Sequence, residues 1–188
     1  MKKRKIVIIR GKTTGGKSTI SYELAKVLPG WIFIDGWKIK EMFDSLYLKD
    51  EQTTRVKSSK KAVISIMKEV MRAEGINIIL QESTQSALRK SLRKDLKKYN
   101  YEIYSIFLEV ELKDAIKRDI KREKPTMRVN KRNLPSHEWK KMGNQPKKED
   151  FIINTSHKNK KEVINSILKH IKEKRKKHPK AHLIKRSW

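Results

Sequence analysis

The chain has 188 residues, which is enough for one domain with a hydrophobic core, and it contains no cysteine. The lack of cysteine excludes a disulfide framework, a cysteine-based metal site and a thiol nucleophile. Lysine and arginine total 48 against 21 aspartates and glutamates, so the formal net charge is +27. This excess favours a polyanionic partner, nucleic acid above all. The alternative is a lysine-rich surface of the thermophilic kind, although that composition normally enriches glutamate together with lysine.

Nothing in the sequence predicts secretion or a membrane partner. The basic residues 1–5 precede a short apolar run at residues 6–9, which is followed by Arg10 rather than by a cleavage site. No run of 18 or more apolar residues occurs, so no membrane-spanning helix is expected. We therefore expect a cytoplasmic protein.

Apolar runs rich in β-branched residues alternate along the chain with segments of helical periodicity. Strands are predicted at residues 5–10, 31–34, 76–80, 101–110 and 151–153. Helices are predicted at residues 17–28, 62–74, 111–123 and 160–171, and another carries Leu88, Leu92 and Leu96 after a cap at Ser83 or Thr84. Strands that are apolar throughout, between amphipathic helices, are typical of a parallel sheet covered on both faces. The sequence therefore predicts an α/β fold.

The periodic pattern fails between residues 124 and 148, where three prolines and a glycine interrupt it and basic residues dominate. We interpret residues 119–148 as a mobile lid with one short helix near residues 136–142. From Lys169 onward, nine lysines and arginines against one acid predict a fraying helix end and then an irregular basic tail. The expected organisation is a single domain over residues 1–172 and a basic tail over residues 173–188.

A glycine-rich loop connects the first predicted strand to the first predicted helix. Its sequence, G-K-T-T-G-G-K-S, matches the phosphate-loop pattern G-x-x-x-x-G-K-[S/T] in the context that the pattern requires. Glycines let the backbone turn tightly and bring its N–H groups onto a phosphate, and the helix adds its positive end. We expect Lys17 to neutralise the β- and γ-phosphates of a nucleoside triphosphate and Ser18 to ligate Mg²⁺. The expected cofactor-binding residues here are Gly11, Lys12, Thr13, Thr14, Gly15, Gly16, Lys17, Ser18 and Thr19.

The loop alone does not distinguish a GTP switch, an ATPase motor and a kinase. The chain has no guanine-selecting N-K-x-D sequence and is short for a motor, which favours a kinase that uses ATP. Asp35 and Glu82 follow two predicted strands, where a parallel sheet places its ligands. We expect Asp35 to hold the Mg²⁺ shell or accept the acceptor's proton, with an ordinary Asp-Gly turn as the alternative. Glu82 is expected to coordinate a metal-bound water or act as base, with stabilisation of the following helix's dipole as the alternative.

Two arginines, Arg118 and Arg122, lie four residues apart and hence on one face of the helix that leads into the predicted lid. We expect them to reach the transferring phosphate as internal arginine fingers, and we assign Arg122 a catalytic role. The alternative is a solvated basic face. Arg128 and Arg132, inside the predicted lid, are weaker candidates and are assigned to acceptor binding.

These features together resemble the small P-loop kinases that include polynucleotide 5′-hydroxyl kinases, zeta toxins, gluconate kinase and adenylylsulfate kinase. The resemblance covers about residues 4–172 and rests on the phosphate loop and the segments F-I-D-G-W-K-I-K, I-L-Q-E-S-T, D-A-I-K-R-D-I-K-R-E and D-F-I-I-N-T-S. It implies a five-stranded parallel sheet in the order 2-3-1-4-5 and contacts of Arg118 and Arg122 with nucleotide phosphates. It also implies that Thr155 lies in the loop near the adenine. In the polynucleotide kinase of bacteriophages, an element similar to Glu82-Ser83-Thr84 follows the third strand and two arginines four residues apart open the lid, as Arg118 and Arg122 do here. The resemblance to this kinase also implies a basic tunnel for the acceptor.

One segment departs from the pattern of these kinases. Relatives often carry D-G-D-x-[I/V/F]-R after the second strand, whereas this chain has Trp37 in place of the second acid and Lys40 in place of the arginine. In many relatives that second acid binds or deprotonates the acceptor. Here either Asp35 or Glu82 takes the role of base, or the activity is altered. Trp37 can stack on a base or sugar, or it can anchor the following helix. We assign Trp37 and Lys40 to the acceptor site.

The sequence thus predicts a phosphotransferase that moves the γ-phosphate of ATP, or of another triphosphate, to an alcohol group with the help of Mg²⁺. A hydroxyl of RNA or DNA is the main expectation for the acceptor, because of the +27 charge and the basic lid and tail. The first alternative is a kinase for a small metabolite, sugar or antibiotic. The second, of another class, is an RNA-associated ATP-binding protein with little transferase activity.

Overall fold

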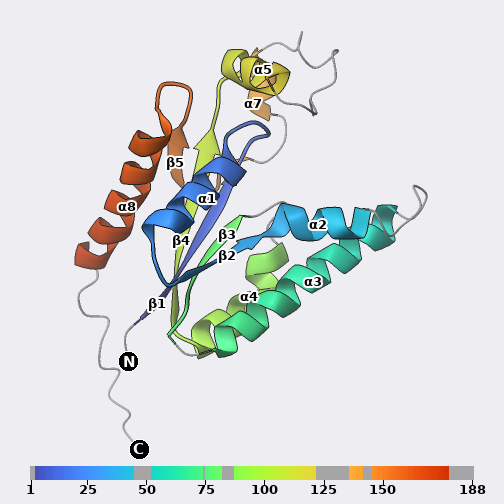
Figure 1. Cartoon of the computed structure of the whole chain (residues 1–188), viewed down its shortest axis with the longest axis vertical. Coiled ribbons are helices and arrows are strands. Elements are labelled where there is room, and N and C mark those ends of the chain that lie inside the picture. The colour runs from blue at the N-terminus through green and yellow to red at the C-terminus, as the bar shows by residue number, and fades with distance from the viewer. Residues whose placement is uncertain are drawn as a thin grey trace, which may run out of the picture.

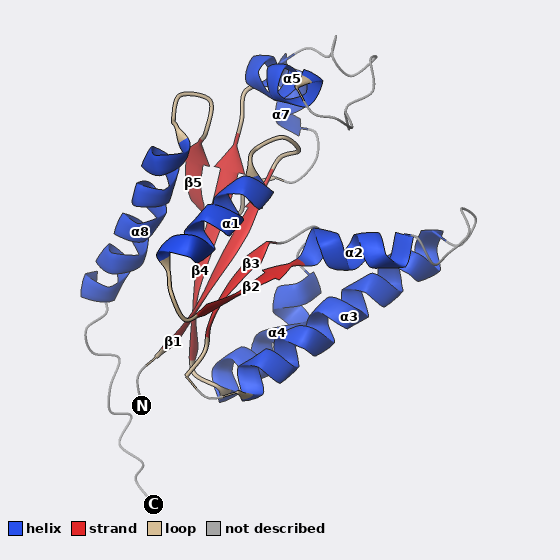
Figure 2. Cartoon of the chain, viewed as in Figure 1, coloured by secondary structure: helices blue, strands red, loops and turns tan. Residues whose placement is uncertain are grey.

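The computed structural model of the chain describes residues 3–44, 52–73, 75–81, 87–121, 136–141 and 145–177. Its five strands are β1 (Arg4–Gly11), β2 (Trp31–Asp35), β3 (Asn77–Gln81), β4 (Tyr101–Glu109) and β5 (Phe151–Asn154). They pair in parallel in the order β2-β3-β1-β4-β5. Helices lie on both sides of this sheet (Figures 1 and 2). The predicted α/β fold and strand order are therefore confirmed.

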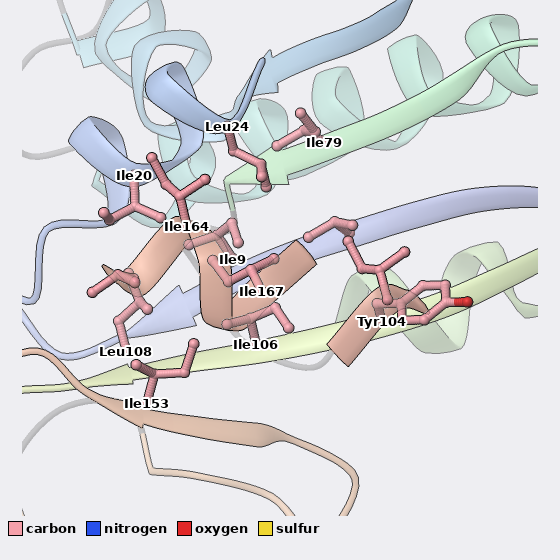
Figure 3. Packing of buried hydrophobic residues seen from close by; sticks show 13 residues of the cluster. Ile9, Ile20, Leu24, Ile79, Tyr104, Ile106, Leu108, Ile153, Ile164 and Ile167 are labelled. Atoms are coloured by element: carbon pink, nitrogen blue, oxygen red, sulfur yellow. The ribbon is translucent and has the colours of Figure 1, made fainter. Parts of the chain in front are cut away.

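Two hydrophobic cores lie on opposite faces of the sheet, because alternate side chains of a strand point to opposite faces. The described helices are α1 (Lys17–Val27), α2 (Gly36–Asp44), α3 (Gln52–Arg72), α4 (Ala87–Lys98), α5 (Leu112–Ile120), α7 (Ser136–Lys141) and α8 (Lys160–Lys177). On one face, Leu24 of α1 and Ile167 of α8 pack against Ile9 and Ile106 of the central strands (Figure 3). On the other face, α3 and α4 cover the sheet through residues such as Met67. The two cores fix the carboxyl ends of the strands relative to one another.

A third and smaller apolar cluster lies where β4 ends. Trp139 of α7 packs there with Val110 and with Ala115 of α5, and it is 7% exposed. Its indole Nε1 donates a hydrogen bond to the carbonyl oxygen of Val110 at 2.9 Å. Figure 1 shows α5 and α7 together beyond the end of β4. The short helix α7 is thus seated next to the carboxyl edge of the sheet, where the phosphate loop also begins.

No helix is among the elements predicted for residues 36–44, where the structure has α2; the other main differences lie at helix ends. The predicted helix at residues 62–74 starts in fact at Gln52 as α3, because residues 52–61 are largely polar and carry little apolar periodicity. The final helix was predicted to end at Ile171, but α8 continues to Lys177. α5 ends at Ile120, earlier than the predicted residue 123. The short helix expected near residues 136–142 is present as α7.

Two further expectations concern caps and membranes. Ser83 and Thr84, the predicted caps of the helix that is α4, lie outside the described residues. Among the helices that are described, none is long and apolar enough to cross a membrane.

Candidate active site

The phosphate loop joins β1 to α1 through a turn that requires glycine at its first position. Gly11 has a φ of 146°, and a Cβ built on it would lie 2.2 Å from the carbonyl oxygen of Leu108 on β4. Thr14 and Gly16 also have positive φ angles, of 61° and 86°. Loops with such left-handed residues form the concave backbone turns whose N–H groups bind anions. The sequence motif therefore adopts the kind of backbone that suits a phosphate.

The charged side chain of Lys17 belongs to the first residue of helix α1, so it lies at the N-terminal end of that helix. Its Nζ donates hydrogen bonds to the carbonyl oxygens of Gly11 at 3.1 Å and of Lys12 at 2.8 Å. Helix α1 begins at Lys17, has no side-chain cap at Gly16 and has no acidic residue in its first turn. The first N–H groups of a helix have no partner inside the helix and carry partial positive charge. The ammonium and the helix end together make an electropositive region of the kind that suits an anion such as phosphate.

Gln81, the last residue of β3, reaches the phosphate loop and was missed by the sequence analysis. Its Nε2 donates a hydrogen bond to Oγ of Ser18 at 3.0 Å, and the residue is 2% exposed. Its other amide atom, Oε1, is buried and has no hydrogen-bond partner in the described part of the chain. Buried polar atoms are nearly always paired in folded proteins. This oxygen is therefore suited to receive a donor or a cation beside Ser18.

Asp35 ends β2 and caps the helix that follows. Its Oδ1 accepts hydrogen bonds from the backbone N–H groups of Trp37 at 2.9 Å and Lys38 at 3.2 Å. This N-cap geometry fixes the carboxylate and accounts for an aspartate here without any catalytic role. Oδ2 takes no hydrogen bond from the described residues. Asp35 is also the register partner of Gln81 on β3, so the carboxylate and the amide lie on neighbouring strand ends.

Trp37 and Lys40 lie together on the first turn of α2. The Lys40 Nζ is 4.8 Å from the centroid of the Trp37 ring, and the indole Nε1 donates a hydrogen bond to Oε1 of Glu41 at 2.5 Å. Trp37 is 42% exposed. An anchoring tryptophan would be buried in a core, whereas this ring lies on the surface just after Asp35. Part of this side chain is therefore exposed to solvent beside the Lys40 ammonium.

Arg118 of α5 joins the phosphate loop to the segment that follows β5. Its Nη1 donates to Oγ1 of Thr155 at 2.9 Å and to the carbonyl oxygen of Thr14 at 3.4 Å. Its Nη2 donates to the carbonyl oxygen of Thr155 at 2.6 Å. Thr155 is itself 4% exposed and is held by its backbone N–H and its hydroxyl on the carbonyl oxygen of Glu109. Two residues expected near the nucleotide, far apart in sequence, are thus brought together beside the loop.

The other residues of the expected cofactor segment differ in their surroundings. Thr13, Ser18 and Thr19 are exposed, whereas Gly15 is buried. Lys12 turns its side chain away from the loop, is 3% exposed and donates from Nζ to backbone carbonyls of α7. Burial lowers the pKa of the Lys12 ammonium, and the negative charge of Glu109 partly opposes this effect.

A buried ion pair fixes the chain segment before β5, and sequence patterns gave no sign of it. Arg10, 2% exposed at the end of β1, pairs through Nη1 with Oδ2 of Asp150. Asp150 also accepts hydrogen bonds from Oγ of Ser105 at 2.5 Å and from the backbone N–H of Lys147 at 2.7 Å. Burial alone would raise the pKa of Asp150, but the hydrogen bonds from Ser105, Lys147 and Arg10 and the charge of Arg10 outweigh it and lower this pKa. The pair anchors this segment to Arg10, the residue that precedes Gly11.

The donor atoms near Ser18 fit a magnesium ion bound with a nucleotide. They are the hydroxyl of Ser18 and the buried amide oxygen of Gln81, and the carboxylate of Asp35 lies at the end of the neighbouring strand. All three are hard oxygen ligands of the kind that Mg²⁺ prefers. No cluster of three or more histidine, aspartate or glutamate side chains that could hold a metal occurs within the described ranges. A magnesium ion here would take its remaining ligands from phosphates and water, as is usual for this ion.

Four predicted site residues lie outside the described residues. They are Glu82, Arg122, Arg128 and Arg132. Their assignments as base, arginine finger and acceptor ligands remain predictions.

The fold is shared with solved kinases, although no family model matches the sequence and no curated protein is found as a relative. The APS kinase of Mycobacterium tuberculosis, in complex with AMPPNP and APS, has a TM-score of 0.62 and 15% identity, covering 92% of this chain and 99% of that one. A sugar kinase from Janibacter sp. HTCC2649 has a TM-score of 0.61 and 18% identity, covering 91% and 95%. A gluconokinase from Sinorhizobium meliloti 1021 has a TM-score of 0.59 and 13% identity, covering 97% and 100%. The chain therefore has the fold of the P-loop kinases over nearly all of its length.

Proposed function

We propose that this protein is a kinase that transfers the γ-phosphate of a nucleoside triphosphate, ATP in the first place, to a hydroxyl group. The observation that carries the proposal is the convergence of positive groups on one concave loop. Lys17 is held on the carbonyl oxygens of Gly11 and Lys12, α1 begins at the same residue without an acid in its first turn, and Arg118 reaches Thr14. A triphosphate is the ligand that matches such a set of donors.

The chemistry assigned to this chain is positioning and charge neutralisation. The backbone N–H groups of the loop and the ammonium of Lys17 bind the β- and γ-phosphates, and Arg118 with Thr155 borders the nucleotide. Ser18 and Asp35, with Gln81 behind them, would hold Mg²⁺, which supplies neutralisation of the phosphate charge when bound. The acceptor oxygen forms a bond to the γ-phosphorus. The bond between the γ-phosphorus and the β–γ bridging oxygen breaks, and the nucleoside diphosphate leaves with that electron pair. Either Asp35 or Glu82 takes the proton of the acceptor hydroxyl; if Oδ2 of Asp35 ligates Mg²⁺, the base is Glu82.

A small molecule is the acceptor that we propose. The solved proteins with this fold include a sugar kinase and a gluconokinase, whose acceptors are small hydroxyl compounds. The exposed ring of Trp37 beside Asp35 offers a stacking face for the ring of a sugar or a nucleoside.

A polynucleotide hydroxyl, the main expectation from the sequence, is kept as the second candidate. The observation that favours it is the net charge of +27, which would attract a polyanion. The comparisons lend it no support, and for this reason it takes second place.

A labelled-ATP transfer assay tests the proposal and separates its two acceptors. The purified protein is offered a panel of sugars, sugar acids, nucleosides and other small alcohols and, separately, RNA and DNA with 5′-hydroxyl ends. We expect label on a small acceptor with the wild type and none with Lys17→Ala. Label on polynucleotide alone would replace the small acceptor by the second candidate. Nucleotide binding without transfer to any acceptor would contradict the kinase and favour an ATP-binding protein of another class.

A further inference from the structure

Lys12 occupies a variable position of the phosphate loop but makes its side-chain contacts with another part of the molecule. Its Nζ donates hydrogen bonds to the carbonyl oxygens of Trp139 at 2.5 Å and of Lys140 at 3.0 Å, in the last turn of α7. The ammonium also lies 5.1 Å from the centroid of the Trp139 ring. A cation at the carboxyl end of a helix satisfies carbonyls that have no partner within the helix and opposes the negative end of the dipole. Lys12 therefore caps α7 from the phosphate loop.

The backbone of the same residue positions the catalytic lysine. The carbonyl oxygen of Lys12 accepts hydrogen bonds from Lys17 Nζ at 2.8 Å and from the backbone N–H of Gly15 at 3.1 Å. Its own N–H donates to the carbonyl oxygen of Leu108 on β4 at 3.2 Å. The first two of these contacts lie within the phosphate loop, and the third ties the loop to β4. A displacement of Lys12 must therefore move the carbonyl against which the Lys17 ammonium is held.

Helix α7 has an independent attachment to the edge of the sheet. The indole of Trp139 donates to the carbonyl oxygen of Val110 and packs on Ala115. A cavity of about 630 Å³ borders this contact and is lined by Lys12, Trp139 and Lys113 among others. With six residues, α7 is too short to be stable without such tertiary contacts. Its position thus depends on two attachments, one of which is a residue of the phosphate loop.

We propose that Lys12 is a positioning residue that couples α7 to the phosphate loop, so that α7 and bound triphosphate stabilise each other. The inference rests on the proposed binding of a triphosphate by residues 11–18. The hydrogen bonds to α7 hold the side chain of Lys12, and the backbone carbonyl of Lys12 in turn holds Lys17 in the geometry that binds phosphate. Coupling between two sites is reciprocal, so a nucleotide that fixes the loop must also fix α7. Lys12 does this work without contacting the substrate through its side chain.

Hydrogen exchange of the α7 backbone, measured with and without AMPPNP and Mg²⁺, tests the coupling. In the wild type we expect nucleotide to slow the exchange of the amides in residues 136–141. Lys12→Met keeps the length of the side chain but removes the ammonium, so α7 should exchange faster and gain no protection from nucleotide. The affinity for AMPPNP should fall about fivefold or more, the lower range of such couplings. Lys113→Met, which removes an exposed lysine of the same cavity, should behave as the wild type.

A second variant separates coupling from folding. Trp139→Phe removes the hydrogen bond to Val110 but keeps an aromatic ring beside Lys12 and the two backbone carbonyls that accept its hydrogen bonds. It should therefore loosen α7 and still show protection by nucleotide. An equal gain of protection in the wild type and in Lys12→Met would overturn the coupling, even if Lys12→Met is less stable to urea. A wild type that binds AMPPNP with no change in α7 would also overturn it. A wild type that binds no nucleotide would instead overturn the proposed function, and the coupling with it.

Discussion

The buried pair of Arg10 and Asp150 gives the most quantitative test of how the sheet supports the site. In the wild type two donors, Arg10 Nη1 and the Lys147 N–H, meet one carboxylate oxygen of Asp150. Asp150→Asn keeps the size of the side chain but replaces this oxygen by an amide N–H₂ group or by an amide oxygen, which is a weaker acceptor. The guanidinium, 2% exposed, then lacks its counter-charge. Removing one partner of a buried ion pair costs about 3–5 kcal/mol. For a chain of this size we expect the melting temperature to fall by at least about 6 °C.

Urea unfolding at pH 7, followed by circular dichroism, measures the loss directly. Asp95→Asn on α4, where the aspartate side chain makes no ion pair with the described residues, is the matched control and should cost less than about 0.5 kcal/mol. The double variant Arg10→Met with Asp150→Leu should recover part of the loss, because it leaves no unpaired charge. A change below about 0.5 kcal/mol in Asp150→Asn would refute the reasoning that this pair anchors the segment before β5.

The same variant should alter the dependence of stability on pH. The pKa of Asp150 is lowered in the folded protein, so its contribution is present above the ordinary aspartate pKa of about 3.9 and is lost as the pH falls through the folded-state value. The wild type should therefore lose stability relative to Asp150→Asn as the pH is lowered from about 5 through the ordinary aspartate pKa and toward the lower pKa of the folded state. Unfolding curves of the two proteins at several acidic pH values measure this difference, and parallel curves would contradict it.

Three further substitutions test the site residue by residue. Gly11→Ala should lower the free energy of unfolding in urea by about 1–3 kcal/mol and abolish nucleotide binding, because the new Cβ would lie 2.2 Å from the Leu108 carbonyl oxygen. The control Gly30→Ala, where the new Cβ meets open space, should keep nucleotide binding. Arg118→Met should weaken nucleotide binding by about tenfold or more in calorimetry, through loss of a charged hydrogen-bonding group; wild-type affinity would contradict its placement. Gln81→Leu should raise the Mg²⁺ concentration needed for tight nucleotide binding by about tenfold, with binding in EDTA unchanged; an unchanged requirement would remove Gln81 from the metal site.

The sheet could be predicted from the sequence because its signal is local. Each strand is a run of apolar, mostly β-branched residues, and each helix between strands repeats apolar positions every three or four residues. The strand order did not follow from that pattern, but was implied by resemblance to known kinases. The start of α3 was missed because its first turns carry polar residues, whose helical structure depends on contacts elsewhere.

The site could be predicted where a motif specifies the backbone. The phosphate loop needs particular glycines, so its position is readable from spacing alone. The partners of that loop could not be found in this way, because they are distant in sequence. Asp150 lies 140 residues from Arg10, and Trp139 lies 127 residues from Lys12.

Gln81 was missed for a chemical reason. It lies at the end of a strand, as Asp35 does, but a neutral amide in a sequence does not indicate a metal or phosphate site in the way that a carboxylate does. Its relation to the loop is visible in the hydrogen bond to Ser18 and in the buried Oε1, which has no partner among the residues that the structure describes.

The central claim is that residues 11–18 bind the phosphates of a nucleoside triphosphate. Isothermal titration of the full-length protein with AMPPNP and Mg²⁺, beside Lys17→Met, tests it most directly. The account predicts saturable binding of one nucleotide per chain by the wild type and a loss of affinity of about tenfold or more in the variant, because a charged hydrogen-bonding group is removed. Equal affinity of the two proteins, or no binding by the wild type, would contradict the claim.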